Sequence, residues 1–137
     1  MKLSRASTYA VHALAYLAEQ GEEHAVASHT IAKARGIPER FLLKVLKPLA
    51  SGSILRSMKG PNGGYRLARP MAKITLLEVI EIVEGPIRGL LPSFEGSDNQ
   101  KADDRLEAVC DQAAEALRKQ LRAVTLAELV GEGGKKK

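Results

Sequence analysis

Apolar residues recur at helical spacing along the first part of the chain and predict three helices. The first runs from Ser4 to Gln20, with Ser4 or Ser7 as its N-cap. Ser28 offers an N-cap hydroxyl to a short second helix, which Gly36 ends. The third helix covers residues 38–50. Its expected buried positions are Phe41, Leu42, Val45, Leu46 and Leu49.

The pattern then changes to two short runs that are typical of strands, residues 53–57 and 64–67. Between them, Gly60-Pro61 turns the chain sharply and Asn62-Gly63 tolerates positive φ. Three helices followed by a hairpin are the order of a winged helix-turn-helix, in which the second helix of the turn lies in a DNA major groove. The hairpin would be the wing of that fold.

Beyond the wing the pattern is helical again. Thr75 caps a helix over residues 76–84, a long helix follows at about 102–123, and Thr125 caps a last short helix. We therefore expect a mostly α-helical chain with a small β-hairpin wing. Its expected parts are a winged helix-turn-helix domain over 1–85, a linker loop over 86–101, a long helix with a short C-terminal helix over 102–131, and a disordered basic tail over 132–137.

Composition and charge indicate where the protein is located and what kind of partner it binds. The sequence has no apolar run long enough to span a membrane and no signal peptide, and its single cysteine cannot form an internal disulfide, so we expect a cytoplasmic protein. Residues 1–75 carry twelve Lys and Arg against four acidic residues, whereas residues 76–137 carry nine against twelve. The basic N-terminal half predicts a polyanion as partner, with a merely solvated basic surface as the alternative.

Catalytic motifs are lacking from the sequence. We find no Ser/His/Asp or Cys/His arrangement and no paired carboxylates, and the GPNGG turn lacks the Lys-Ser/Thr of a phosphate-binding loop. We therefore expect no enzymatic activity. A DNA-binding protein or a protein-interaction module remains, and the basic N-terminal half favours DNA.

Four segments resemble the Rrf-two (Rrf2) family of bacterial transcription regulators, which includes IscR, NsrR and CymR. They are MKLSRASTYAVHALAYLA, IAKARGIPERFLLKVLKPLASGSILRSMKGPNGGYRLARP, ITLLEVIEIVEGP and LRAVTLAELV. The most specific motifs are S-x-x-G-x-x-G-G-Y-x-L-A in the wing and VIEIVEGP at a helix end. The resemblance implies a homodimeric DNA-binding regulator, expected to be a repressor, that binds a palindromic operator with helix 38–50 and wing 57–67.

The resemblance assigns the DNA contacts to the start of the helix-turn-helix and to the wing. Arg40 is expected on a base, because Arg pairs bidentately with guanine, whereas Lys44 and Lys47 are expected on phosphates. The full expected set is Ser28, His29, Glu39, Arg40, Lys44, Lys47, Arg56, Ser57, Lys59, Gly60, Pro61, Asn62, Gly63, Gly64, Tyr65 and Arg66. Arg69 is expected to extend the same face.

In the family, the long helix pairs with its mate in the partner subunit. The resemblance therefore implies a dimer interface that consists of Leu106, Val109, Cys110, Ala113, Leu117 and Leu121. Such a stripe is too long for one small domain to cover, although a helix folded back on its own domain is the alternative. An effector, which the sequence does not identify, would act through the linker.

Many relatives hold an iron–sulfur cluster with three cysteines before and at the start of the long helix. Here residues 87–109 contain no cysteine, Asp104 stands where the third one is usual, and Glu107 stands at a histidine-ligand position. Thiolates favour such clusters and carboxylates do not. We therefore expect no cofactor and no metal. The alternative is a non-standard metal or haem site at His12 and Cys110.

Overall fold

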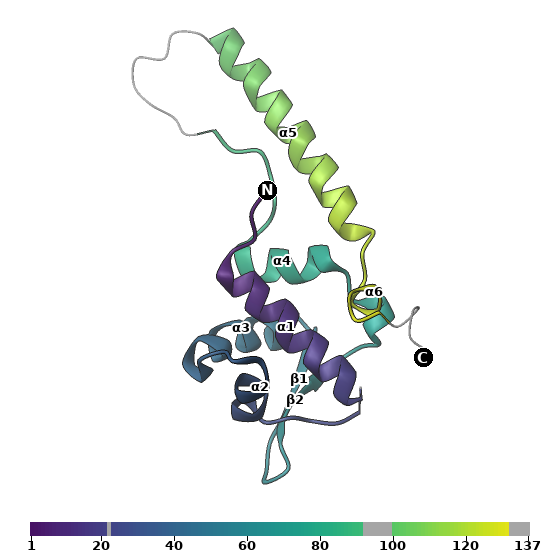
Figure 1. Cartoon of the computed structure of the whole chain (residues 1–137). Helices are drawn as coiled ribbons and strands as arrows, with labels where there is room; N and C mark the ends of the chain where they lie inside the picture. The colour runs from purple at the N-terminus through teal and green to yellow at the C-terminus, as the bar shows by residue number, and fades with distance from the viewer. Residues whose placement is uncertain (22, 92–99, 132–137) are drawn as a thin grey trace.

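The computed structural model describes residues 1–21, 23–91 and 100–131 (Figure 1). Its elements are, in chain order, α1 (Arg5–Gln20), α2 (Ser28–Arg35), α3 (Glu39–Ser51), β1 (Leu55–Met58), β2 (Gly64–Leu67), the 3₁₀ turn η1 (Met71–Lys73), α4 (Leu76–Glu84), α5 (Gln100–Arg122) and α6 (Leu126–Leu129). The predicted mostly α-helical fold with a small hairpin and a long C-terminal helix is confirmed. The predicted tail at 132–137 and part of the predicted linker lie outside the described residues.

Two of the predicted helix signals act as expected and one does not. Ser4 is the N-cap of α1, and Gly36 ends α2 in the left-handed conformation with φ of 67°. The prediction that Ser28 caps α2 is wrong, because Ala27 is the N-cap residue and it makes no side-chain cap. Ser28 is the first helical residue, and its hydroxyl instead donates to Glu39 Oε2 at 2.7 Å. That bond links the starts of α2 and α3.

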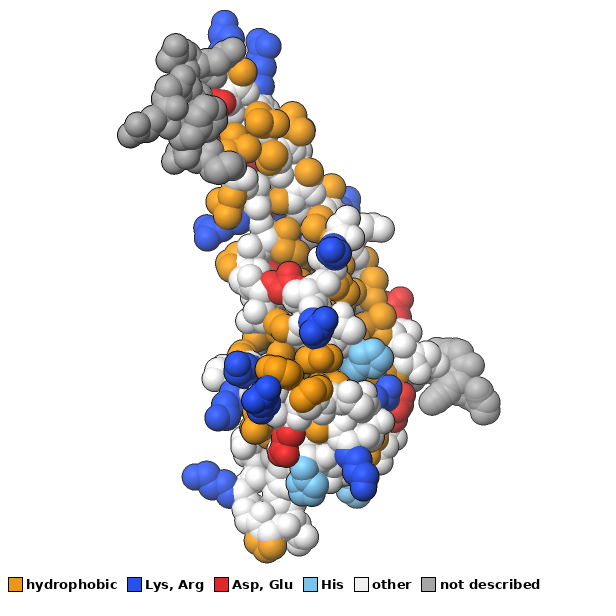
Figure 2. Space-filling model, turned by 60° about the vertical axis from the view of Figure 1, so that its left-hand side comes forward, with side chains coloured by type: hydrophobic (Ala, Val, Ile, Leu, Met, Phe, Trp, Pro, Cys, Tyr) orange, Lys and Arg blue, Asp and Glu red, His pale blue; other side chains and the backbone are white. Residues whose placement is uncertain are grey.

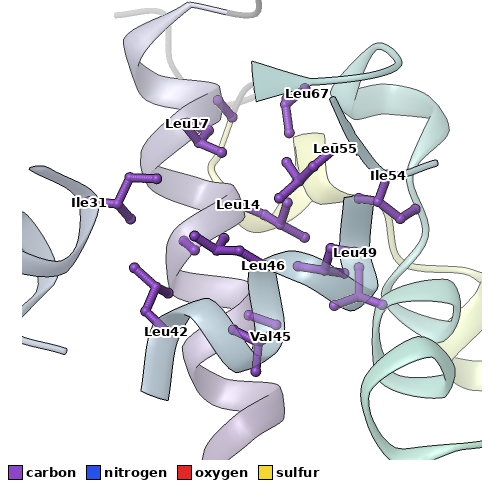
Figure 3. Close-up of a cluster of buried hydrophobic side chains, with 14 of the residues drawn as sticks. Leu14, Leu17, Ile31, Leu42, Val45, Leu46, Leu49, Ile54, Leu55 and Leu67 are labelled. Atoms are coloured by element: carbon purple, nitrogen blue, oxygen red, sulfur yellow. The ribbon is translucent and has the colours of Figure 1, made fainter. Parts of the chain in front are cut away.

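Aliphatic side chains of the first three helices and the hairpin meet in one core (Figure 3). The labelled members are Leu14, Leu17, Ile31, Leu42, Val45, Leu46, Leu49, Ile54, Leu55 and Leu67, and all of them are buried. The prediction that Phe41 is also buried is wrong, because 38% of it is exposed. The core stripe of α3 is centred on Leu42, Val45 and Leu46, and Phe41 lies at the outer edge of that stripe.

The hairpin pairs β1 and β2 antiparallel, with Leu55 opposite Leu67 on its buried face. A further bridge joins its base to the loop before α2, because the amides and carbonyls of Val26 and Tyr65 exchange two hydrogen bonds of 2.8 Å. The wing is therefore fixed to the helix-turn-helix by backbone as well as by core packing.

Glycine is required in the wing for two different reasons, a positive φ angle and a close approach of two backbone segments. Gly60 and Gly64 adopt positive φ of 102° and 144°, whereas Asn62 and Gly63, which tolerate positive φ, do not adopt it. Gly64 also lies so close to the preceding loop that a Cβ would come within 2.2 Å of the Val26 carbonyl oxygen. At Gly63 a Cβ would meet the Met58 carbonyl oxygen at the same distance. The G-x-x-G-G spacing thus permits a turn and two close backbone approaches.

Helix α5 projects away from the other helices (Figure 1), and none of its described residues is buried. Its C-terminal half contacts α4, where Arg118 forms an ion pair with Glu81. The same Glu81 carboxylate accepts a hydrogen bond from the Ile87 amide at 2.9 Å. Further along that segment, Gly89 touches the middle of α5, since a Cβ there would lie 2.6 Å from the Cys110 carbonyl carbon.

Helix α6 returns the chain to the body. Thr75 and Thr125 form an antiparallel bridge, and each caps its helix in a capping box, with Glu78 and Glu128 respectively. Leu126 is buried and its amide donates to the Ile74 carbonyl at 2.8 Å. Among the described residues, no helix combines the length and the apolar character that a membrane span needs.

Candidate nucleic-acid interface

Helix α3 presents three exposed cations, Arg40, Lys44 and Lys47, on the side opposite its core stripe. The Arg40 guanidinium lies 4.9 Å from the centre of the exposed Phe41 ring, and the Lys44 ammonium lies 5.7 Å from it. Cation–π contacts of this kind hold a charge in place without neutralising it. None of the three cations forms an ion pair with a residue of the described ranges.

The polar residues beside these cations lie at the first turns of α2 and α3. Glu39 begins α3, where a carboxylate suits the positive end of the helix dipole, and the Ser28 hydroxyl holds it there. His29 is exposed on the first turn of α2. The helix-turn-helix therefore brings Ser28, Glu39 and Arg40 to the N-terminal end of α2 and α3. In helix-turn-helix proteins, residues at this end of the second helix contact the major groove of DNA.

The wing places two cations directly opposite each other. Arg56 of β1 is in register with Arg66 of β2, and strand alternation puts both on the face away from the buried Leu55–Leu67 pair. Like charges in such a pair are destabilising unless an anion lies between them. The Arg66 Nε is moreover buried without a hydrogen-bond partner among the described residues. This arrangement favours binding of a phosphate.

The rest of the predicted wing set is divided between the tip and the base. Lys59, Gly60, Pro61 and Asn62 are exposed at the tip, and Ser57 is exposed on β1. The half-buried Tyr65 packs against the core, while Gly63 and Gly64 contribute backbone only. Figure 2 shows Lys and Arg side chains spread over the end of the molecule that carries the hairpin.

Arg69 does not extend this face, contrary to the prediction from the sequence. Its guanidinium pairs with both carboxylate oxygens of Glu78, at 2.6 and 3.3 Å, and donates to the Lys73 carbonyl at 2.8 Å. The hydrogen bond from Arg69 is the main reason that the pKa of Glu78 is lowered. Arg35 is likewise occupied, since it pairs with Glu19 at 2.8 Å. These arginines stabilise the fold, whereas Arg40, Lys44 and Lys47 on α3 and Arg56 and Arg66 on the wing form no ion pair with a described residue.

Sequence analysis missed two features. Phe41 organises the exposed cations, and the available signal was an apolar residue between Arg40 and Lys44 that the core stripe of α3 does not need. The Glu81–Arg118 pair joins α5 to α4 across 37 residues of sequence, and no local pattern indicates such a contact.

The predicted dimer stripe lies along α5 (Figure 2), where hydrophobic side chains form a visible row. Leu106 and Val109 are 51% and 59% exposed, and Ala113 is exposed as well. Cys110, Leu117 and Leu121 are half-buried. The N-terminal half of α5 projects from the winged-helix elements in Figure 1, and about half of each of the Leu106 and Val109 side chains is exposed.

The donor atoms present do not fit an iron–sulfur cluster, which needs several thiolates. The whole chain has one cysteine, and among the described residues no group of three His, Cys, Asp or Glu is arranged to hold a metal ion. Asp104, Glu107 and Cys110 occupy successive turns of α5, and His12 is exposed on α1.

Comparison with protein families gives a match over residues 3–132 to the Rrf2 model, described as an iron-dependent transcriptional regulator. YffB of Lactococcus lactis, a candidate HTH-type transcriptional regulator, is 31% identical over 96% of this chain and 88% of its own length. Protein aau3 of Rhizobium meliloti is 40% identical over 84 residues, which is 61% of this chain. The matched region spans only 54% of the length of aau3.

Solved structures show the same fold. CymR, the global cysteine regulator of B. subtilis, superposes with a TM-score of 0.74 at 24% identity and covers 96% of this chain and 98% of its own. IscR of T. potens superposes with a TM-score of 0.74 at 25% identity over 100% of this chain and 93% of its own. Both neighbours are similar along the whole length, α5 included.

Proposed function

The chain belongs to the Rrf2 family of transcriptional regulators, and on that premise we propose that it is a homodimeric repressor that binds a palindromic DNA operator through α3 and the wing. The family and its relatives are transcriptional regulators rather than enzymes. Repression would follow from occupancy, because a protein bound to the operator excludes polymerase from the same DNA.

The observation that carries the proposal is the set of cations without acidic partners on α3 and the wing. Arg40 and Lys44 are exposed on α3, and Arg56 faces Arg66 across the hairpin. Together they supply what a phosphate backbone needs, and Arg40 in the first turn of α3 has the length and the paired donors to reach a guanine edge. Arg35 and Arg69 serve as an internal contrast, because both are ion-paired.

The apolar stripe of α5 supports the dimer. Leu106 and Val109 are more than half exposed, and a helix with an uncovered apolar stripe of this length is stabilised by a partner helix. A second copy of α5 has the same stripe, so a twofold pairing is self-complementary. Such a dimer would present its two α3 helices to half-sites roughly 34 Å apart.

The ion pair of Glu81 with Arg118 supports a route for regulation. It joins α4, the last helix of the winged-helix region, to α5, and the Glu81 carboxylate also accepts a hydrogen bond from the Ile87 amide after α4. A change in this joint would alter the angle between the two parts and therefore the spacing of the two α3 helices. We propose that an effector acts on that angle.

The test is to select bound duplexes from a random pool and to measure affinity for the selected operator and for random DNA. Arg40→Ala should cost about 1–3 kcal/mol on the operator and relax preference at one base position. Lys47→Ala should weaken both duplexes alike and lower the salt slope by about one. Arg105→Ala on α5 is the matched control and should change neither affinity.

Equal losses on operator and random DNA for Arg40→Ala would contradict base recognition by this residue. Absence of binding to any duplex in dilute buffer would contradict the proposed function.

A further inference from the structure

A hollow of about 270 Å³ lies where α1, α3 and α4 meet. Its walls are apolar, with Tyr9 and Ala6 on α1, Phe41 and Pro48 on α3, and Val83 on α4. The volume approaches the lower end of the range for small-molecule sites, which are mostly apolar with a few placed polar groups. The hollow shares Phe41 with the proposed DNA-binding face.

Two cations, Arg5 and Lys44, line the same hollow. The Arg5 side chain makes no hydrogen bond or ion pair with any described residue, and Lys44 forms a cation–π contact with the Phe41 ring but no ion pair with a described residue. Glu84 forms no ion pair with either cation, and its carboxylate accepts hydrogen bonds from the hydroxyls of Ser4 and Ser7. Apolar walls with two cations that form no ion pair with a described residue are complementary to an anion with a short apolar body.

We propose that this hollow binds a small amphipathic carboxylate and that binding of this ligand lowers the affinity of the protein for DNA. The carboxylate would bind Arg5 and Lys44, and the apolar body would lie against Tyr9, Phe41 and Val83. The second half rests on the proposed function, because Lys44 is also an expected phosphate contact. A carboxylate on Lys44 competes with the phosphate and adds negative charge to the DNA-facing helix.

The first test uses the full chain without DNA, so it stands even if the proposed function fails. Octanoate, 1-octanol and acetate are titrated into the protein separately, while the NMR chemical shifts of the backbone amides and the heat of binding are recorded. Octanoate should bind with a Kd on the order of 100 µM, 1-octanol at least tenfold more weakly, and acetate without saturation. Shifts should centre on Ala6, Tyr9 and Val83. Equal binding of octanoate and octanol would overturn the proposal.

Two variants locate the site. Arg5→Gln should weaken octanoate binding about tenfold, whereas Arg105→Gln, an exposed arginine on α5, should leave it unchanged. Ala6→Leu fills the hollow and should abolish binding, and thermal unfolding checks that each variant folds. Unchanged octanoate binding in folded Arg5→Gln or Ala6→Leu would overturn the proposed site.

Protein dilution without octanoate is a further control. If the amide chemical shifts of Ala6 and Tyr9 change on dilution and not on addition of octanoate, the hollow is occupied by a second copy of the chain, and the proposal is overturned.

The second test adds a selected DNA duplex. Saturating octanoate should raise the Kd for DNA about five- to tenfold in the wild type and not in Arg5→Gln. Octanoate that binds the hollow and leaves DNA affinity unchanged would overturn the regulatory half of the proposal.

Discussion

The winged-helix region, which is α1 to α4 with the hairpin, and helix α5 both carry apolar residues at helical spacing, but those residues lie in opposite environments. In the winged-helix region the apolar stripes meet one another, and Leu14, Leu42 and Leu46 are completely buried. On α5 none of the described residues is buried, and Leu106 and Val109 remain more than half exposed. An apolar stripe therefore predicts that a partner exists, and only the tertiary structure tells whether the partner belongs to the same chain.

The two regions also differ in how their charges are used. In the winged-helix region some arginines stabilise the fold by ion pairs, whereas the cations of α3 and the wing stay free. At α5 the notable charge is Arg118, which pairs with Glu81 and joins the two regions. We infer that the first region binds DNA, that the second brings two copies together, and that this pair sets the geometry between them.

The largest expected effect comes from the core of the winged-helix region. Leu14→Ala should lower the free energy of unfolding by about 2–5 kcal/mol, because it leaves a cavity among buried side chains. Leu106→Ala on α5 should change the stability of the isolated protomer by no more than about 0.5 kcal/mol. Urea denaturation followed by circular dichroism, at several protein concentrations, measures both. Equal losses would contradict the contrast between the regions.

The second effect concerns association. Leu106→Glu and Val109→Glu together should weaken dimerisation about 100-fold or more, since two carboxylates would be desolvated in an apolar interface. The helical content of the protomer should be retained. Ala108→Glu, an exposed position off the stripe, is the control and should remain dimeric. Sedimentation velocity separates the outcomes, and a double variant that sediments like the control would refute pairing through α5.

The third effect concerns the joint between the regions. Arg118→Ala should cost about 1 kcal/mol of stability, because the pair with Glu81 is only partly shielded from solvent. Its affinity for a two-half-site operator should fall more than its affinity for a single half-site. Arg105→Ala should change neither affinity. Equal losses on both duplexes would show that the pair does not control half-site spacing.

The smallest effect is a pH dependence within the winged-helix region. The hydrogen bond from Arg69 lowers the pKa of Glu78, so folding favours the charged carboxylate. Its contribution is present above the ordinary value of 4.5 and is lost as the pH falls through the lowered pKa. Glu78→Gln should therefore cost about 1 kcal/mol at pH 7 and reduce the slope of stability below pH 5. Acid titration of unfolding would contradict this if Glu107→Gln, an exposed control, gave the same slope.

Local features of the fold were predictable from sequence because they depend on neighbours along the chain. Thr75 and Thr125 cap their helices as predicted, and Gly36 ends α2. The failures depend on contacts that are distant in sequence or in rotation about a helix. Ser28 bonds to Glu39 instead of capping, and Phe41 is 38% exposed because it lies at the edge of the stripe of α3 that Leu42, Val45 and Leu46 form.

The candidate site was predictable as a set of residue types but not as a set of free charges. Arg66 and Arg69 lie three residues apart in sequence, yet only Arg69 finds a carboxylate, at Glu78. The pairing of Arg56 with Arg66 follows from the hairpin register, in which Leu55 pairs with Leu67. Charge counting cannot distinguish these roles, since it carries no information on distance.

The most direct test of the account is the stoichiometry of the complex with a selected operator duplex. Sedimentation velocity with a labelled duplex, at protein concentrations across the binding transition, gives the mass of the species that forms. We predict one cooperative complex with two protomers on one duplex. A complex of one protomer with the duplex at saturation would contradict it.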